Sequence, residues 1–149
     1  MKKSILFFLL LFFSLCFSQT DKDLHGKWNT TDAGNQGSFT FFSDGYVKLE
    51  LDGLKIDGRN HVIPDGPNKG KVAHVKYTAD FSQKVIRFNL IGSYNDTNNK
   101  LEESKFLSGL IKFVNENEFL LFLDFENKKP ADIDPASPDV LILHREKSL

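Results

Sequence analysis

The chain has 149 residues, 26% of them charged, and a formal net charge of −1 at pH 7. A chain of this length forms one domain and can bury a core without disulfide or metal support. No cluster of Lys or Arg residues offers the positive surface that nucleic acid requires, so we expect no nucleic-acid partner.

The N-terminus has the pattern of a secretory signal peptide. Lys2 and Lys3 form a positive region, residues 5–13 form an apolar run, and residues 16–18 end in a small residue suited to cleavage. The run is shorter than the roughly 20 residues that a helix needs to cross a bilayer, so we predict no transmembrane segment. We predict a signal peptide over residues 1–18, cleavage between Ser18 and Gln19, and export to the periplasm or out of the cell.

Cys16 raises the alternative of a lipid anchor. The lipobox of lipoproteins has a small residue immediately before the cysteine, whereas Leu15 occupies that position here, so a lipid-anchored form is not expected. Cleavage after Ser18 would remove the single cysteine and leave a domain without disulfides. It would also remove Lys2 and Lys3, leaving 17 basic residues against 20 acidic ones and a net charge of −3.

The first half of the domain, residues 19–149, is predicted to begin with a polar leader and continue as short strands. We expect residues 19–24 to be loose. The alternating runs 37–43 and 46–51 flank Asp44-Gly45, a dipeptide that favours a hairpin because Gly adopts the positive φ of the tight turn. Residues 54–56 form a further short piece. Residues 58–70 contain two prolines and three glycines and predict a long loop.

The third quarter of the domain repeats the alternating pattern. Residues 71–79 place Val75 and Tyr77 on one face, and residues 84–91 do the same with Phe88. One polar face and one apolar face indicate half-buried antiparallel strands. Residues 94–103 are polar and predict a turn.

The C-terminal part predicts another hairpin and a last strand. Residues 106–114 and 118–125 flank a turn at Asn115-Glu116-Asn117, and 119–123 is apolar on both faces. Either another part of the chain covers the outer side of 119–123, or it forms an association surface. Residues 127–138 carry three prolines and predict a loop before the strand at 140–145.

The pattern predicts an all-β domain of about eight antiparallel strands. Short, evenly spaced strands with hairpin connections favour a closed barrel or a sandwich. No segment after the signal peptide has the 3.6-residue period of a helix, so no alternation of strands and helices is expected.

Several short motifs follow one another in a familiar order. The domain opens with Gly26-Lys27-Trp28, then has Phe39-Thr40-Phe41-Phe42, Tyr77-Thr78-Ala79-Asp80, residues 108–113, Lys129-Pro130 and a final strand ending at Arg145. This set resembles the bacterial small lipocalin-like domains, which begin with Gly-x-Trp. The resemblance covers nearly all of residues 19–149 and implies an antiparallel up-and-down barrel of about eight strands.

The same resemblance implies how the barrel is closed. In lipocalins the Trp of the first strand plugs the closed end, and a basic residue of the last strand lies over it. Trp28 and Arg145 match these two positions, and a guanidinium over an indole is worth about 0.5 to 2 kcal/mol. We expect this pair to be structural. Many related domains have Arg-Pro where this chain has Lys129-Pro130, so no role is carried over to that pair.

No motif predicts catalysis or a metal site. Leu107-Ser108-Gly109 lacks the first glycine of a nucleophile elbow, and residues 66–71 are one residue too short for a phosphate loop. The four histidines have no metal-ligand spacing. We therefore predict that the protein is not an enzyme and has no catalytic residues, no metal and no cofactor.

Two functions remain open. An eight-stranded barrel either fills with its own side chains or holds one small ligand. A small hydrophobic ligand would contact the inward-facing residues Phe41, Leu49, Val75, Tyr77, Phe88 and Phe113. The alternative is a filled barrel acting as a cell-envelope protein-interaction or protease-inhibitor module, with the leader 19–24, the long loops or strand 119–123 meeting the partner.

Overall fold

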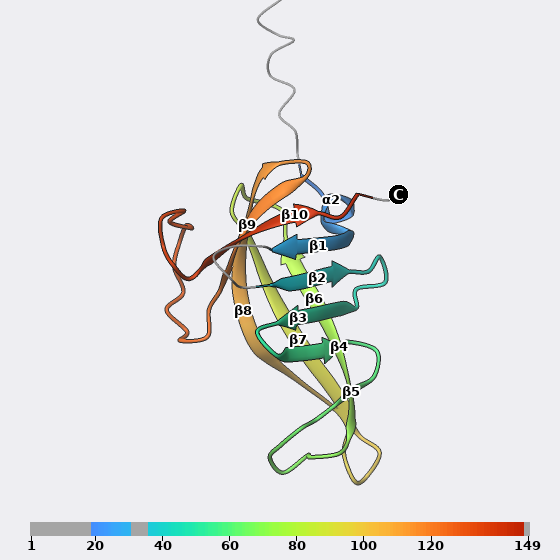
Figure 1. Ribbon diagram of the computed structural model, residues 1–149. Helices are drawn as coiled ribbons and strands as arrows, with labels where there is room; N and C mark the ends of the chain where they lie inside the picture. The colour runs from blue at the N-terminus through green and yellow to red at the C-terminus, as the bar shows by residue number, and fades with distance from the viewer. Residues whose placement is uncertain (1–18, 31–35, 148–149) are drawn as a thin grey trace, which may run out of the picture.

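The computed structural model describes residues 19–30 and 36–147 and contains one antiparallel sheet of ten strands (Figure 1). The predicted cleavage after Ser18 lies at the edge of this part, because Ser18 itself is outside the described residues. The strands are β1 (Gly26–Thr30), β2 (Gly37–Phe41), β3 (Val47–Leu51), β4 (Leu54–Asp57), β5 (His61–Val62), β6 (Val72–Asp80), β7 (Ile86–Asn95), β8 (Leu101–Asn115), β9 (Glu118–Leu123) and β10 (Val140–Arg145).

The sheet has up-and-down topology and nearly closes into a barrel. Its order is β4-β3-β2-β1-β10-β9-β8-β7-β6-β5, so the first and last strands of the chain, β1 and β10, pair with each other. The all-β, up-and-down barrel expected from the sequence is confirmed. The strand number is ten instead of about eight, partly because the segment predicted as a loop at 58–70 contains β5.

Gly58 joins the two sides of the barrel where β3 approaches β6. Its N–H donates to the Val47 carbonyl at 2.9 Å, and its carbonyl accepts from the Val75 N–H at 2.7 Å. A Cβ at this position would lie 2.3 Å from the Val47 oxygen and 2.4 Å from the Val75 oxygen. Both distances are far shorter than a van der Waals contact, so this seam needs glycine.

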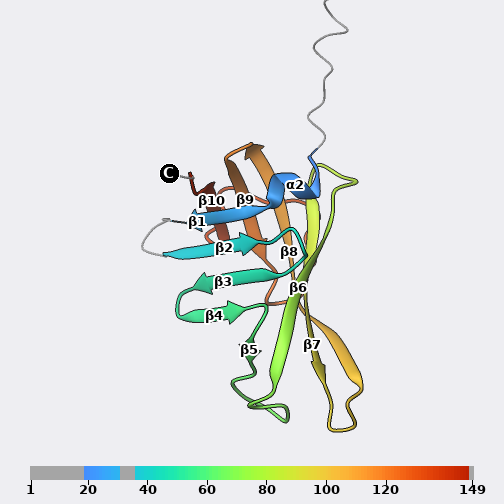
Figure 2. The same ribbon diagram turned by 90° about the vertical axis from the view of Figure 1, so that its right-hand side faces the viewer.

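Strands β6, β7 and β8 extend well beyond the shorter strands β1 to β4 (Figure 2). Half of the polar segment 94–103, predicted as a turn, is the paired end of this extension, since Glu102 and Glu103 lie opposite Tyr94 and Ser93. The turn itself is centred on Asp96, whose side chain accepts from the backbone N–H of Asn98 and Lys100. The predicted turn was too long, because both faces of this hairpin end are polar and the sequence shows no alternation there.

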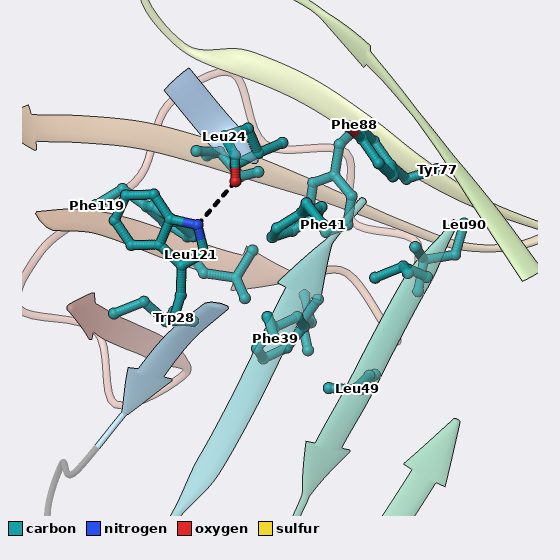
Figure 3. Close-up of a cluster of buried hydrophobic side chains, with 14 of the residues drawn as sticks. Leu24, Trp28, Phe39, Phe41, Leu49, Tyr77, Phe88, Leu90, Phe119 and Leu121 are labelled. Atoms are coloured by element: carbon teal, nitrogen blue, oxygen red, sulfur yellow. Dashed lines mark hydrogen bonds between the residues drawn. The ribbon is translucent and has the colours of Figure 1, made fainter. Parts of the chain in front are cut away.

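The leader is folded, which corrects the expectation of a loose segment at 19–24. Residues Asp21–Leu24 form one helical turn, α2, at the closed end of the barrel (Figure 1). Leu24 is fully buried, and its carbonyl accepts a 2.8 Å hydrogen bond from the Trp28 indole (Figure 3). A single turn is too short to show a helical period, and tertiary contacts stabilise it.

In the part of the chain that the structure describes, no helix has the length and apolar character needed to span a membrane.

Two apolar clusters hold the barrel together. The larger one fills the interior and includes Trp28, Phe39 and Phe88. The smaller one lies outside β8 and β9, where Leu120 packs with Leu110, Ile133 and Val140. The outer face of strand 119–123 is therefore covered by the β9–β10 connection, through Ile133, which decides between the two alternatives left open by the sequence.

Candidate functional site

A large hollow lies between the two edges of the sheet. It has a volume of about 730 Å³ and is bordered by β4, β5 and the middle of β8. We call it the edge hollow. Its lining consists of Gly53, Leu54, Lys55, Ile56, Asp57, Asn60, His61, Val62, Pro64, Phe106, Leu107 and Phe125.

Exposed apolar side chains gather around the edge hollow. Four of the seven large apolar residues that are exposed in the described part line it, with exposed fractions from 43% to 68%. These four are Leu54, Val62, Phe106 and Phe125. Ile56 and Leu107, which are buried members of the core, also belong to the lining. Apolar side chains that converge on one concave surface are typical of a binding site.

A β-bulge places Phe106 in the hollow. Leu90 pairs with Leu107 and Ile91 pairs with Lys105, so Phe106 has no partner across the ladder. The extra residue breaks the alternation of β8, and both Phe106 and Leu107 line the hollow. The Phe106 ring lies over Gly92, where an added Cβ would be 3.5 Å from the ring.

The residues predicted to contact a ligand lie in the packed core instead of in this lining. Phe41, Leu49, Tyr77 and Phe88 point toward one another inside the barrel (Figure 3), and Val75 and Phe113 belong to the same cluster. All six are buried, and none lines the edge hollow. Sequence reasoning missed Leu54, Val62 and Phe106, because none of them lies in a regular alternating run. The adjacent pair Phe106-Leu107 was the available signal.

Trp28 and Arg145 form the closed end of the barrel. The Arg145 guanidinium carbon lies 4.1 Å from the Trp28 ring centroid. The guanidinium also donates to the carbonyls of Asp23, His25 and Glu116. The pair thus ties α2, the β8–β9 turn and both terminal strands together.

Polar side chains beside the closed end of the barrel hold the leader in place. The Tyr77 hydroxyl donates to Asp21 Oδ1 at 3.1 Å, and His25 Nε2 lies 2.8 Å from Asp21 Oδ2. Burial first, and then the negative charge of Asp21, raise the pKa of Tyr77. Tyr77 therefore stays protonated and acts as a hydrogen-bond donor rather than as a base. Among residues 19–30 and 36–147, no three His, Cys, Asp or Glu residues form a group that could hold a metal ion.

Comparison with protein-family models, with curated proteins and with solved structures found no match. The resemblance to lipocalin-like domains stays a prediction from the motifs given above.

Proposed function

We propose that this domain is an exported carrier that binds a small apolar molecule in the edge hollow. The observation that carries the proposal is the convergence of Leu54, Val62, Phe106 and Phe125, from four separate chain segments, on one concave surface. The volume of about 730 Å³ falls within the range of roughly 300 to 1,000 Å³ typical of small-molecule sites.

The physical driving force would be removal of these side chains from water. Full burial of a large apolar side chain contributes about 1.5 to 3 kcal/mol, and the four are about half exposed, so covering them contributes about 1 kcal/mol each. The ligand's own apolar surface adds to this amount. Asn60 and His61, which also line the hollow, supply hydrogen-bonding groups for a polar end of the ligand.

The lining also supports a second candidate, an extended peptide that adds to the sheet. Gly53 and all four residues of β4 border the hollow, although successive side chains of a strand point to opposite faces. A run of consecutive residues indicates that the backbone edge of β4 faces the hollow. In the described sheet β4 pairs only with β3 and β5 only with β6, so both edges offer backbone groups to a peptide strand.

Protease inhibition through the leader receives less support. In the described part of the chain, the residues from Asp21 to Leu24 are held by Tyr77, Trp28 and Arg145. Insertion of this segment into an active site would require these contacts to break.

The first test is binding of the apolar dye Nile red to the mature domain, followed by native mass spectrometry of protein purified from its own host. Val62→Asn and Val114→Asn form a matched pair, because both valines are 56% exposed and only Val62 lines the hollow. We expect Val62→Asn to weaken dye binding about fivefold and Val114→Asn to leave it unchanged. Absence of saturable binding, or equal effects of both variants, would contradict the proposal.

Amide hydrogen exchange separates the two candidates. A peptide strand would protect backbone N–H groups of β4 and β5 in an alternating pattern, since ladder hydrogen bonds form at every second residue. A small apolar ligand would cover side chains, and the backbone N–H groups would then show no alternating protection.

A further inference from the structure

A second hollow lies on the outer face of β7 and β8, beneath the start of the β9–β10 connection. Its volume is about 210 Å³, and it shares no lining residue with the edge hollow. We call it the outer hollow. Its lining includes Arg87, Asn89, Lys105, Ser108, Asp124 and Lys129.

Three cationic residues from separate segments line the outer hollow. Arg87 comes from β7, Lys105 from β8 and Lys129 from the connection. Within the described residues, none of the three makes an ion pair within 4.0 Å. Asp80 lies directly opposite Arg87 across the β6–β7 pair, yet it is outside ion-pair distance.

The register of the sheet brings the polar groups of the floor together. Asn89 lies opposite Ser108, and the Ser108 hydroxyl donates to Asn89 Oδ1 at 3.1 Å. Lys105 lies opposite Ile91, two residues further along the same face of β7 as Asn89. Because of the bulge at Phe106, Lys105 and Ser108 line the outer hollow, while Phe106 and Leu107 line the edge hollow.

Asp124 fixes the connection that carries Lys129. Its two carboxylate oxygens accept from the backbone N–H groups of Lys128 at 2.7 Å and Lys129 at 2.8 Å. The Asp124 N–H donates to the Ser108 carbonyl, which ties the connection to β8. This carboxylate is nearly buried and its hydrogen bonds go to backbone groups, so it does not pair with the three cationic side chains.

The backbone of the connection is held in an unusual conformation. Asn127 and Lys129 have φ values of +56° and +52°, in the left-handed region. A residue other than glycine in this region costs about 1 kcal/mol or more, and such conformations are enriched at binding sites. The local hydrogen bonds of Asp124 stabilise this arrangement, which keeps Lys129 at the hollow.

We propose that the outer hollow binds a compact oxyanion, specifically a phosphate group, between Arg87, Lys105 and Lys129. The three positive charges outnumber the one negative charge of Asp124 in the same lining. This excess suits a phosphate dianion, and a guanidinium can donate two parallel hydrogen bonds to it. The volume of about 210 Å³ is below the roughly 300 Å³ at which drug-sized ligand sites begin. It nevertheless exceeds the about 30 Å³ occupied by one water molecule several-fold.

The test is an NMR titration of the mature domain with inorganic phosphate at low ionic strength. We expect saturable shifts at the amides of Asn89, Ser108 and Lys129. Lys129→Gln and Arg87→Gln should each weaken phosphate binding at least tenfold. Lys22→Gln, on α2, is the control, because Lys22 lines neither hollow and an effect of net charge alone would change binding equally in all three variants.

A phosphate group could come from a free molecule or from a lipid headgroup, and co-sedimentation with phosphatidylglycerol vesicles separates these sources. Binding of inorganic phosphate without vesicle binding supports a free anion, and vesicle binding lost in Lys129→Gln supports a headgroup. No saturable binding of either probe, or equal weakening by Lys22→Gln, overturns the proposal. Val62→Asn should leave phosphate binding unchanged, so this result is independent of the apolar site.

Discussion

Trp28 and Arg145 are direct partners across the β1–β10 pair, and the guanidinium carbon of Arg145 lies 4.1 Å from the Trp28 ring centroid. The two residues are 117 positions apart in the chain, so their contact closes almost the whole domain into one ring. Arg145 also donates to carbonyls of the leader and of the β8–β9 turn. One side chain of β10 therefore contacts β1, the leader and the β8–β9 turn.

Replacement of Arg145 by Leu should lower the free energy of unfolding by about 2 to 3 kcal/mol, because the cation–π contact and three hydrogen bonds to carbonyls are lost. Arg145→Lys keeps the charge and loses the planar fork, so its loss should be intermediate. Urea denaturation of residues 19–149 measures both variants. Equal stability of the wild type and Arg145→Leu would show that the closed end does not depend on this contact.

Replacement of Gly58 by Ala should open the seam between β3 and β6. The new Cβ would lie 2.3 Å and 2.4 Å from two carbonyl oxygens, and we expect a loss of at least about 2 kcal/mol from this overpacking. Gly66→Ala is the control. Its φ is +82° and nothing lies within 4 Å of the added Cβ, so it should cost only the left-handed penalty of about 1 kcal/mol. Hydrogen exchange at the Val75 N–H, which donates to Gly58, should accelerate only in Gly58→Ala.

Stability should fall in alkaline solution because of Tyr77. Its pKa in the folded protein is raised above the ordinary value of 10.0 by burial and by Asp21. Above pH 10 the unfolded chain loses this proton while the folded chain keeps it, so the free energy of unfolding decreases as pH rises. Below pH 10 the contribution of Tyr77 to the free energy of unfolding is fully present. Tyr77→Phe should remove the part of the decrease with pH that comes from Tyr77, and urea denaturation between pH 9 and 11 measures it.

Replacement of Asp124 by Asn should destabilise the β9–β10 connection. The carboxylate makes two charge-assisted hydrogen bonds to backbone N–H groups, and we expect a loss of about 1 to 3 kcal/mol. Asp132→Asn is the comparison, because the Asp132 side chain that pairs with Lys112 is 61% exposed and should contribute much less. Thermal unfolding by circular dichroism tests the difference. Similar losses in both variants would mean that the buried carboxylate has no special role in the connection.

Alternation was sufficient to predict the strands whose one face is buried. Ile86, Phe88 and Leu90 alternate with polar residues, and each is buried as expected. The same rule found the apolar interior but could not say whether it is filled, because large side chains in a barrel are compatible with both outcomes. The structure places the six expected ligand contacts in the core.

The features that sequence reasoning missed depend on contacts between distant segments. The α2 turn is held by Trp28, Tyr77 and Arg145, and none of these contacts has a local sequence signal. Lys105 and Lys129 line the same hollow only because the β9–β10 connection folds back over β8. The edge hollow depends on a bulge, and a bulge appears in the sequence only as a break in alternation.

The bulge at Phe106 makes one short piece of β8 a wall common to two hollows. Lys105 and Ser108 line one side, and Phe106 and Leu107 line the other, while the neighbours Asp124 and Phe125 are divided in the same way. If a ligand in one hollow shifts this part of β8, the lining of the other hollow shifts with it, and no domain has to move. Under thermodynamic linkage the effect is reciprocal. An apolar ligand that raises the affinity for the anion would therefore itself bind with higher affinity when the anion is bound.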